Sequence, residues 1–320
     1  MLNRMVRRAA AGTGGTGAGS DELRHGYLQA WDAGDTDEAR RLLLDLLAVD
    51  ARPEFWFDLG LLAKWRRDWG ESARANRRAL EGDVRLRENP AAWNLGVAAT
   101  ALDDWSTARR AWRDYGVEIP ERRGPIAMVL GPIPVRLNPR PRYPGQEPLL
   151  LDGAEHEVEV VWARRLSPAH AVVDSVPLPD SGHAWGDVVL IDGEPVGERW
   201  DGTQWLPVFN ELERLSTLGA TTWEVRVECP APLDARALTD LAAARGLGAE
   251  DWTAGFRIVC VACSDGRPGG PGHDHTPSPQ EWATARTFGM AGSEAQVVAA
   301  LETWRGGGAD RAHAAPVELR

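Results

Sequence analysis

The stretch Arg67–Leu80, RDWGESARANRRAL, has the pattern of a tight turn followed by an amphipathic helix. The same pattern occurs upstream in Ala33–Leu47, AGDTDEARRLLLDLL, and downstream in Leu102–Gly116, LDDWSTARRAWRDYG. Aligned by the turn, the three stretches are offset by 33 and 36 residues. A period close to about 34 residues is typical of helical hairpins that stack side by side into an array.

Each hairpin needs small residues where its two helices meet. In the turn alignment, Gly34, Arg67 and Asp103 correspond. The predicted first helices contain Gly60 and Gly96, and a glycine there lets the second helix approach closely. In the first hairpin the pair Gly26-Tyr27 takes the place of the Leu-Gly pairs of the other two. We expect a small residue of each second helix to fill the same contact, namely Ala39, Ser72 and Ala108.

With these features the chain resembles the tetratricopeptide repeat (TPR) family over about residues 21–116. Another helical-hairpin solenoid is the alternative interpretation. The resemblance implies a scaffold that binds a peptide or protein in a concave groove, lined by the first helix of each hairpin. The alternative is that the groove packs against the C-terminal half of the same chain. By position, the groove residues are Arg24, Trp31, Phe57, Asp58, Leu61, Trp65 and Asn94.

One binding mode of the family clamps the C-terminal carboxylate of a ligand with Lys, Arg and Asn side chains. Asn94 suits such a position, and Arg24 is a second candidate. Asp58 would repel a carboxylate, and Leu28 offers no hydrogen bond. We therefore expect no carboxylate clamp for an acidic chaperone tail.

Composition restricts the function further. A chain of 320 residues suggests two or three domains. The net charge of −11 argues against a general nucleic-acid binder, and no apolar run reaches the roughly 18 residues of a membrane span. Residues 1–20 have the composition of a Gly-rich tail and lack the apolar core of a secretory signal. Three cysteines are too few for a disulfide framework, which favours a cytoplasmic protein.

The middle of the chain changes to β periodicity. Glu157–Arg164, EVEVVWAR, alternates polar and apolar residues. Within Asp187–Val208, the Asp-Gly pairs at Asp192 and Asp201 predict tight turns between three strands. We expect a small antiparallel barrel or sandwich.

A possible acid–base pair lies in the same region. His183 and Asp187 occur in a loop bounded by glycines, where they could act as a base and its orienting group. No Ser or Cys nucleophile has a recognisable context nearby. A structured polar loop is the simpler interpretation of these two residues.

The C-terminal part has the pattern of a βαβ unit with following helices. Thr221–Glu228 and Phe256–Val261 are predicted strands, with a helix over Ala235–Arg245 between them, and such a pair should be parallel. Further helices are predicted over Ser278–Arg286 and Ser293–Trp304.

One constellation in this part has the chemistry of a metal site. Its spacing is C-x₂-C-x₉-H-x-H, and its residues are Cys260, Cys263, His273 and His275. Four such ligands would complete a tetrahedral zinc site with no open position, which is the arrangement of a structural zinc. Two rival interpretations remain, a strand whose thiols face opposite sides and a redox pair.

Together these features predict a multidomain α and α+β protein. The fold class is a TPR-like helical hairpin array, then a β-rich barrel- or sandwich-like segment, then a βαβ unit with C-terminal helices. The C-terminal part resembles only bacterial proteins that carry such repeats. The expected divisions are residues 1–20 as a tail, 21–118 as repeats, 119–215 as the β-rich domain, 216–305 as the α+β subdomain and 306–320 as a second tail.

The function expected from the sequence is that of a cytoplasmic, non-catalytic adaptor with a structural zinc, whose groove binds a protein or peptide. We expect neither nucleic acid nor a membrane as a partner. One alternative is a metal-dependent hydrolase that uses the Cys/His-bound zinc. The other is a dedicated immunity or chaperone partner of another protein.

Overall fold

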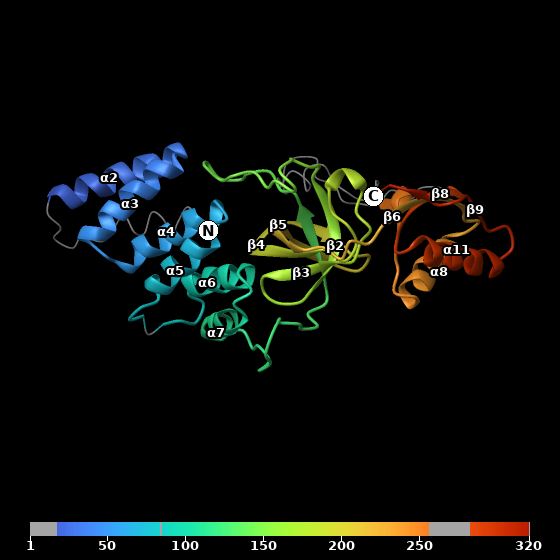
Figure 1. Ribbon diagram of the computed structural model, residues 1–320, viewed down its shortest axis with the longest axis horizontal. Coiled ribbons are helices and arrows are strands. Elements are labelled where there is room, and N and C mark those ends of the chain that lie inside the picture. Colours follow the sequence, from blue (N-terminus) through green and yellow to red (C-terminus); the bar gives the residue numbers. More distant parts are fainter. Residues whose placement is uncertain (1–17, 84, 256–281, 320) are drawn as a thin grey trace. The chain divides into compact units, whose positions relative to one another are not determined.

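The computed structural model describes residues 18–83, 85–255 and 282–319 (Figure 1). The chain divides into two compact units. The helical unit consists of Met1–Met128 with Arg140–Leu149, and the β-containing unit consists of Val129–Pro139 with Leu150–Arg320. A helical array followed by a β-containing part confirms the predicted α and α+β organisation.

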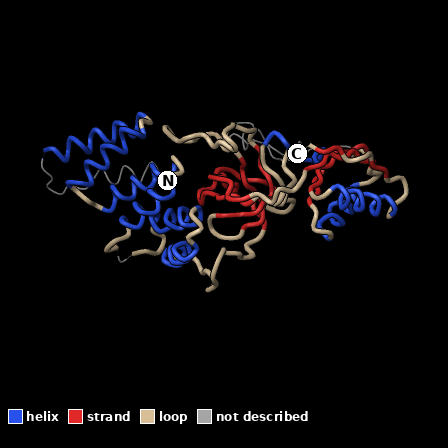
Figure 2. The backbone as a smooth tube through the Cα atoms, viewed as in Figure 1, coloured by secondary structure: helices blue, strands red, loops and turns tan. Residues whose placement is uncertain are grey.

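In the helical unit, consecutive helices pair into hairpins, as Figure 2 shows in blue. The first hairpin is α2 with α3, the second α4 with α5, and the third α6 with α7. Pro53 and Pro90 begin the first helices of the second and third hairpins, where a missing N–H costs nothing. The bounds are α2 Ala18–Ala33, α3 Thr36–Val49, α4 Pro53–Trp65, α5 Trp69–Ala79, α6 Pro90–Ala101 and α7 Trp105–Tyr115.

The turns inside the three hairpins share one geometry. Gly34, Arg67 and Asp103 all have positive φ, at 75°, 55° and 55°. Only glycine adopts this region without strain, so Arg67 and Asp103 hold it at a cost. The same three residues were matched by the alignment of the sequence.

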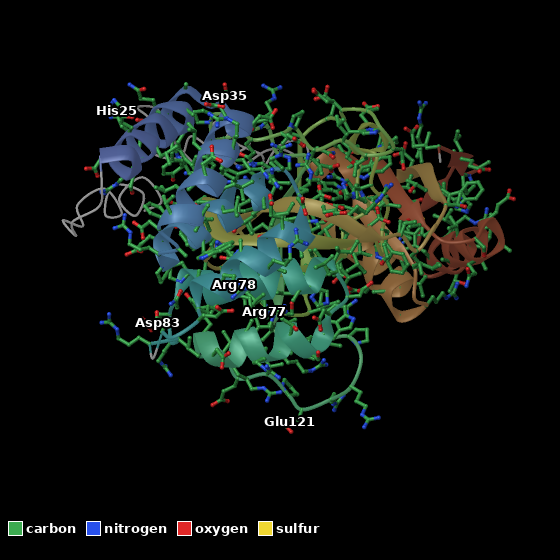
Figure 3. The ribbon with its side chains drawn as sticks, turned by 60° about the vertical axis from the view of Figure 1, so that its left-hand side comes forward. His25, Asp35, Arg77, Arg78, Asp83 and Glu121 are labelled. Carbon is green, nitrogen blue, oxygen red and sulfur yellow. The ribbon has the colours of Figure 1, made fainter. Side chains whose placement is uncertain are left out.

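An aspartate follows each of these turns and caps the next helix. Asp35, Asp68 and Asp104 each accept a hydrogen bond from the backbone N–H three residues on, at 3.0, 2.8 and 3.1 Å. Figure 3 shows Asp35 at the turn of the first hairpin, and Arg77 and Arg78 on the exposed face of α5. The turn, the cap and the helix are therefore one repeated local structure.

The glycines of the first helices do allow close approach, but to a different partner than expected. A Cβ on Gly96 would lie 2.6 Å from the ring of Trp112, and one on Gly60 would collide with the side chain of Asn76. Both partners lie one helical turn beyond the expected Ser72 and Ala108. The Ser72 hydroxyl instead donates to the Gly60 carbonyl at 2.9 Å.

The β-containing unit begins with a closed barrel in strand order β1-β2-β3-β4-β5. Neighbouring strands are antiparallel, but β1 and β5 close the barrel in parallel, through Val135 opposite Phe209 and Arg136 opposite Asn210. An odd number of alternating strands requires this, because the first and last then run in the same direction. The bounds are β1 Pro132–Leu137, β2 Glu159–Arg165, β3 His170–Val173, β4 Val188–Trp200 and β5 Trp205–Ser216.

One predicted turn in this barrel is wrong. The Asp192-Gly193 pair does not end a strand, since β4 continues through it with register shifts between Ile191 and Gly197. The pair forms a bulge, which bends a strand of a small barrel without ending it. Asp201 does form a hairpin turn, where its side chain accepts the N–H groups of Thr203 and Gln204.

The C-terminal part is a sheet with strand order β10-β6-β8-β7, and β9 also pairs with β6. Strand β8 is antiparallel to both β6 and β7, so β6 and β7 run in the same direction with β8 between them. This is a split βαβ arrangement with the strand order of ferredoxin-like folds. The bounds are β6 Thr222–Glu228, α8 Pro232–Ala244, β7 Gly248–Asp251, α9 Trp252–Gly255, β8 Ala285–Ala291, α11 Glu294–Gly306, β9 Ala312–His313 and β10 Val317–Glu318.

Both long helices of this part, α8 and α11, cover one side of the sheet (Figure 2). Leu238 of α8 and Leu301 of α11 are fully buried against Val225 and Phe288 of the strands. Among the described helices, none combines the length and the apolar character that a membrane crossing requires.

Two sequence predictions for this part need correction, and a third lies outside the described residues. The strand after α8 is β7, at Gly248–Asp251, and the predicted strand over residues 256–261 lies outside the described residues. In the predicted helix over residues 278–286, the described residues 282–284 are not helical and Arg286 belongs to β8. The predicted tail over residues 306–320 contains β9 and β10, which pair with β6. These strands have two residues each, too few for a periodic pattern in the sequence.

Candidate functional site

The proline-rich segment Arg140–Leu149 belongs to the helical unit, although the residues on both sides of it belong to the β-containing unit. Its anchor is Tyr143, whose ring stacks on Trp65 with centroids 5.2 Å apart and planes 12° apart. Trp65 in turn contacts Trp31 at 5.0 Å. Tyr143 thus extends a row of aromatic rings that starts on the first helices of the array.

Tyr143 is the first residue of a β-turn. The Gln146 N–H donates to the Tyr143 carbonyl at 3.1 Å, and Gly145 has φ +72°. Proline at the second position and glycine at the third is the chemistry of a type II turn. The Gln146 side chain closes the turn from outside, accepting the N–H groups of Arg142 at 2.8 Å and Tyr143 at 3.3 Å.

The turn lies against the first hairpin with very little space between the backbones. A Cβ on Gly34 would lie 2.7 Å from the Pro144 side chain. A Cβ on Gly145 would lie 2.5 Å from the Gly34 carbonyl oxygen and would collide with the Thr36 side chain. Two glycines, one on each side, are therefore needed for this contact.

The second hairpin holds the part of the segment that follows the turn. The Arg67 guanidinium donates to the Glu147 carbonyl at 3.3 Å and also to the Pro148 carbonyl. Arg66 lies 4.0 Å from the Glu147 carboxylate. We call the surface formed by Trp31, Gly34, Thr36, Trp65 and Arg67 the segment site.

The residues predicted to line the groove are only partly accessible. Arg24, Trp31 and Phe57 are half-buried, whereas Leu61 and Trp65 are buried. Of this set, Trp31 and Trp65 come together in the segment site.

Two predicted groove residues connect neighbouring hairpins. The Tyr27 hydroxyl donates to Asp58 at 2.7 Å, and both side chains are buried. Burial raises the pKa of Asp58 to about 7, although the bond from Tyr27 opposes this shift. Asn94 accepts from Lys64 at 3.4 Å, also in a buried position. These polar contacts lie between the first helices of adjacent hairpins.

His183 and Asp187 do come together, and Glu211 joins them. The two nitrogens of His183 lie 3.3 Å from Asp187 and 3.1 Å from Glu211, and all three side chains are fully buried. Burial alone would lower the pKa of His183, but its hydrogen bonds to the two carboxylates outweigh burial and raise it to about 9. An imidazolium enclosed by two carboxylates is not a free base, so we assign this cluster to the packing of the barrel.

The predicted zinc ligands Cys260, Cys263, His273 and His275 lie outside the described residues. Among the residues that are described, no group of three or more His, Cys, Asp or Glu side chains has the arrangement of a metal site. Cys229 is buried, and burial raises the pKa of its thiol to about 11. Cys229 is therefore an unreactive core thiol.

The sequence patterns described above do not indicate the segment site. The available signal was the Pro144-Gly145 pair, which marks a turn. Nothing in the sequence links that turn to Trp65.

No protein-family model matches the chain, and a search of curated proteins finds no significant match.

Proposed function

We propose that the chain is a non-catalytic adaptor of tetratricopeptide type whose helical array binds a peptide segment of a partner protein. The observation that carries the proposal is the segment site. Its array residues contact the non-helical segment Arg140–Leu149 by ring stacking, by close backbone approach and by hydrogen bonds to backbone carbonyls. These are the means by which a protein recognises a peptide.

The repeated hairpin supports the assignment to the tetratricopeptide type. The shared turn geometry, the Asp caps and the close helix approach at Gly60 and Gly96 recur at the expected period. The three cysteines are compatible with a reducing compartment such as the cytoplasm.

A peptide-display selection tests the function. The bait is the emptied variant, in which residues 140–149 are replaced by the same number of alternating Gly and Ser residues. Sequencing of the selected peptides should show enrichment on the emptied variant. The same peptides should be depleted on the unmodified chain, because its own segment occupies the segment site. Circular dichroism is the control that the emptied variant is folded. If the folded emptied variant enriches no peptide, the proposed function is wrong.

We further propose, from the sequence alone, that Cys260, Cys263, His273 and His275 bind a structural zinc. The spacing of two close thiols and two histidines supports it. The rival function, a metal-dependent hydrolase, would need one of these positions open to water. The number of protein ligands distinguishes the two.

A further inference from the structure

The Tyr143–Gln146 turn is held in shape mainly by its own residues. Pro144 fixes the backbone of the second position, and Gly145 supplies the positive φ of the third. The Gln146 side chain bonds back to the N–H groups of Arg142 and Tyr143. A turn of this sequence should lose less conformational entropy on binding than an unrestrained peptide, because proline and the Gln146 hydrogen bonds restrict its backbone.

The segment site matches this turn at three separate points. The Trp65 ring faces the aromatic residue before the proline. The hairpin turn at Gly34 accepts the Pro-Gly bend, and only glycine at the third position avoids Thr36 and the Gly34 carbonyl. The Arg67 guanidinium, which can only donate, bonds to the backbone carbonyls that follow the turn, so it imposes no side-chain identity there.

From this match we infer that the partner's ligand is a Pro-Gly β-turn preceded by an aromatic residue, and that Tyr143-Pro144-Gly145-Gln146 is its copy within the chain. The inference rests on the proposed function and narrows its ligand class. An extended proline-rich strand would lack the bend that fits Gly34. A carboxylate-terminated peptide would leave Trp65 and Gly34 without the groups that they contact here.

The site is confined to the first two hairpins, which provides an internal control. The turn of the third hairpin has the same geometry at Asp103, with the same positive φ of 55° as Arg67. Asp103 and Arg67 therefore share the same left-handed backbone conformation, but the contacts to the proline-rich segment come from Arg67. A glycine at either position relieves the strain, and only the change at Arg67 removes the carbonyl donor.

The experiment uses a labelled synthetic peptide of residues 138–149, NPRPRYPGQEPL, and fluorescence anisotropy with the emptied variant. We expect saturable binding, weakened by about tenfold or more in peptides with Tyr143→Ala or Gly145→Ala. A peptide with Pro141→Ala, which lies before the turn, should bind like the parent. Saturable binding with equal affinity for all four peptides overturns the inference.

Changes in the protein test the location of the site. In the emptied variant, Arg67→Gly should weaken binding of the parent peptide by about tenfold, and Asp103→Gly should leave it unchanged. Gly34→Ala should abolish binding, whereas Gly82→Ala should not. Gly82 has a φ of +79°, close to the +75° of Gly34, but a Cβ there would meet nothing within 4 Å. If Arg67→Gly and Asp103→Gly weaken binding equally, or if Gly34→Ala and Gly82→Ala do, the location assigned to the site is wrong.

The two proposals fail in different ways. If display enriches peptides without an aromatic-Pro-Gly motif, and the labelled peptide does not bind, the ligand class is wrong and the peptide-binding function stands. If neither display nor the labelled peptide gives binding to a folded emptied variant, both are wrong.

Discussion

At the scale of single residues, Asp58 shows how the array uses a carboxyl group inside its core. Burial favours the neutral form and raises its pKa from 3.8 to about 7. Its partner Tyr27 has its own pKa raised, first by burial and then by the charge of Asp58. Burial therefore favours the protonated form of Asp58, although the hydrogen bond from Tyr27 by itself favours the carboxylate.

The sign of the pH dependence follows from that raised pKa. The stabilising contribution of Asp58 is complete below about pH 4 and is lost as the pH rises through about 7. Asp58→Asn keeps an acceptor for Tyr27 and removes the charge. It should raise the free energy of unfolding at pH 8 by a few kcal/mol, on the order of 1.4 kcal/mol per pKa unit, and change it little at pH 4.

Urea denaturation of both proteins at pH 4, 6 and 8, followed by far-ultraviolet circular dichroism, measures this difference. The same substitution at exposed Asp45 is the control and should give no comparable gain at pH 8. Parallel stability profiles of Asp58→Asn and the unmodified chain would show that Asp58 does not titrate in this way.

At the scale of elements, the spacing between paired helices depends on glycine. Gly96 of α6 leaves room for the fully buried Trp112 of α7. Gly70 of α5 has no such role, because a Cβ there would meet its nearest neighbour at 3.5 Å, an ordinary contact. The same residue type thus serves packing in one helix and is dispensable in another.

Alanine at these two positions should have opposite effects on stability. Gly96→Ala forces Trp112 out of its place and should lower the free energy of unfolding by about 1–3 kcal/mol or more. Gly70→Ala should raise it by up to about 1 kcal/mol, because alanine favours the helix. Thermal unfolding of both variants gives the comparison, and a loss of stability in both would refute the assigned role of Gly96.

At the scale of the whole molecule, the order of the chain and the division into units do not coincide. The chain leaves the barrel after β1, contributes ten residues to the helical unit, and returns for β2. The Tyr143 turn is therefore attached at both ends to the β-containing unit. A partner that displaces it would act on the connection between β1 and β2.

Zinc binding would act at the scale of the whole chain, because it would couple residues 260–275 to the stability of the rest. Native mass spectrometry should find one zinc per chain, and Cys263→Ser should remove it. A chelator should lower the melting temperature of the unmodified chain, since structural zinc contributes on the order of 10 kcal/mol in small domains. A metal-free chain whose melting temperature does not respond to a chelator would exclude the site.

The sequence by itself determined the repeated hairpins and the strands β2, β4, β5 and β6, because their signals are local. Each signal acts within a few residues of the chain. These signals are a turn residue with positive φ, an Asp that caps the backbone N–H three residues later, and an apolar stripe along one helix. The hairpin turn at Asp201 is read in the same way. These preferences hold wherever the segment lies, so they are visible before any packing is known.

Tertiary structure alone decided the contacts between distant residues. The bond from Arg67 to Glu147 spans 80 residues, and the bond from Tyr27 to Asp58 spans 31. The insertion of β8 between β6 and β7 also required the folded sheet. Such contacts depend on which faces are buried together and on how closely two backbones approach. Both depend on residues far apart in the chain, so no short stretch of the sequence indicates them.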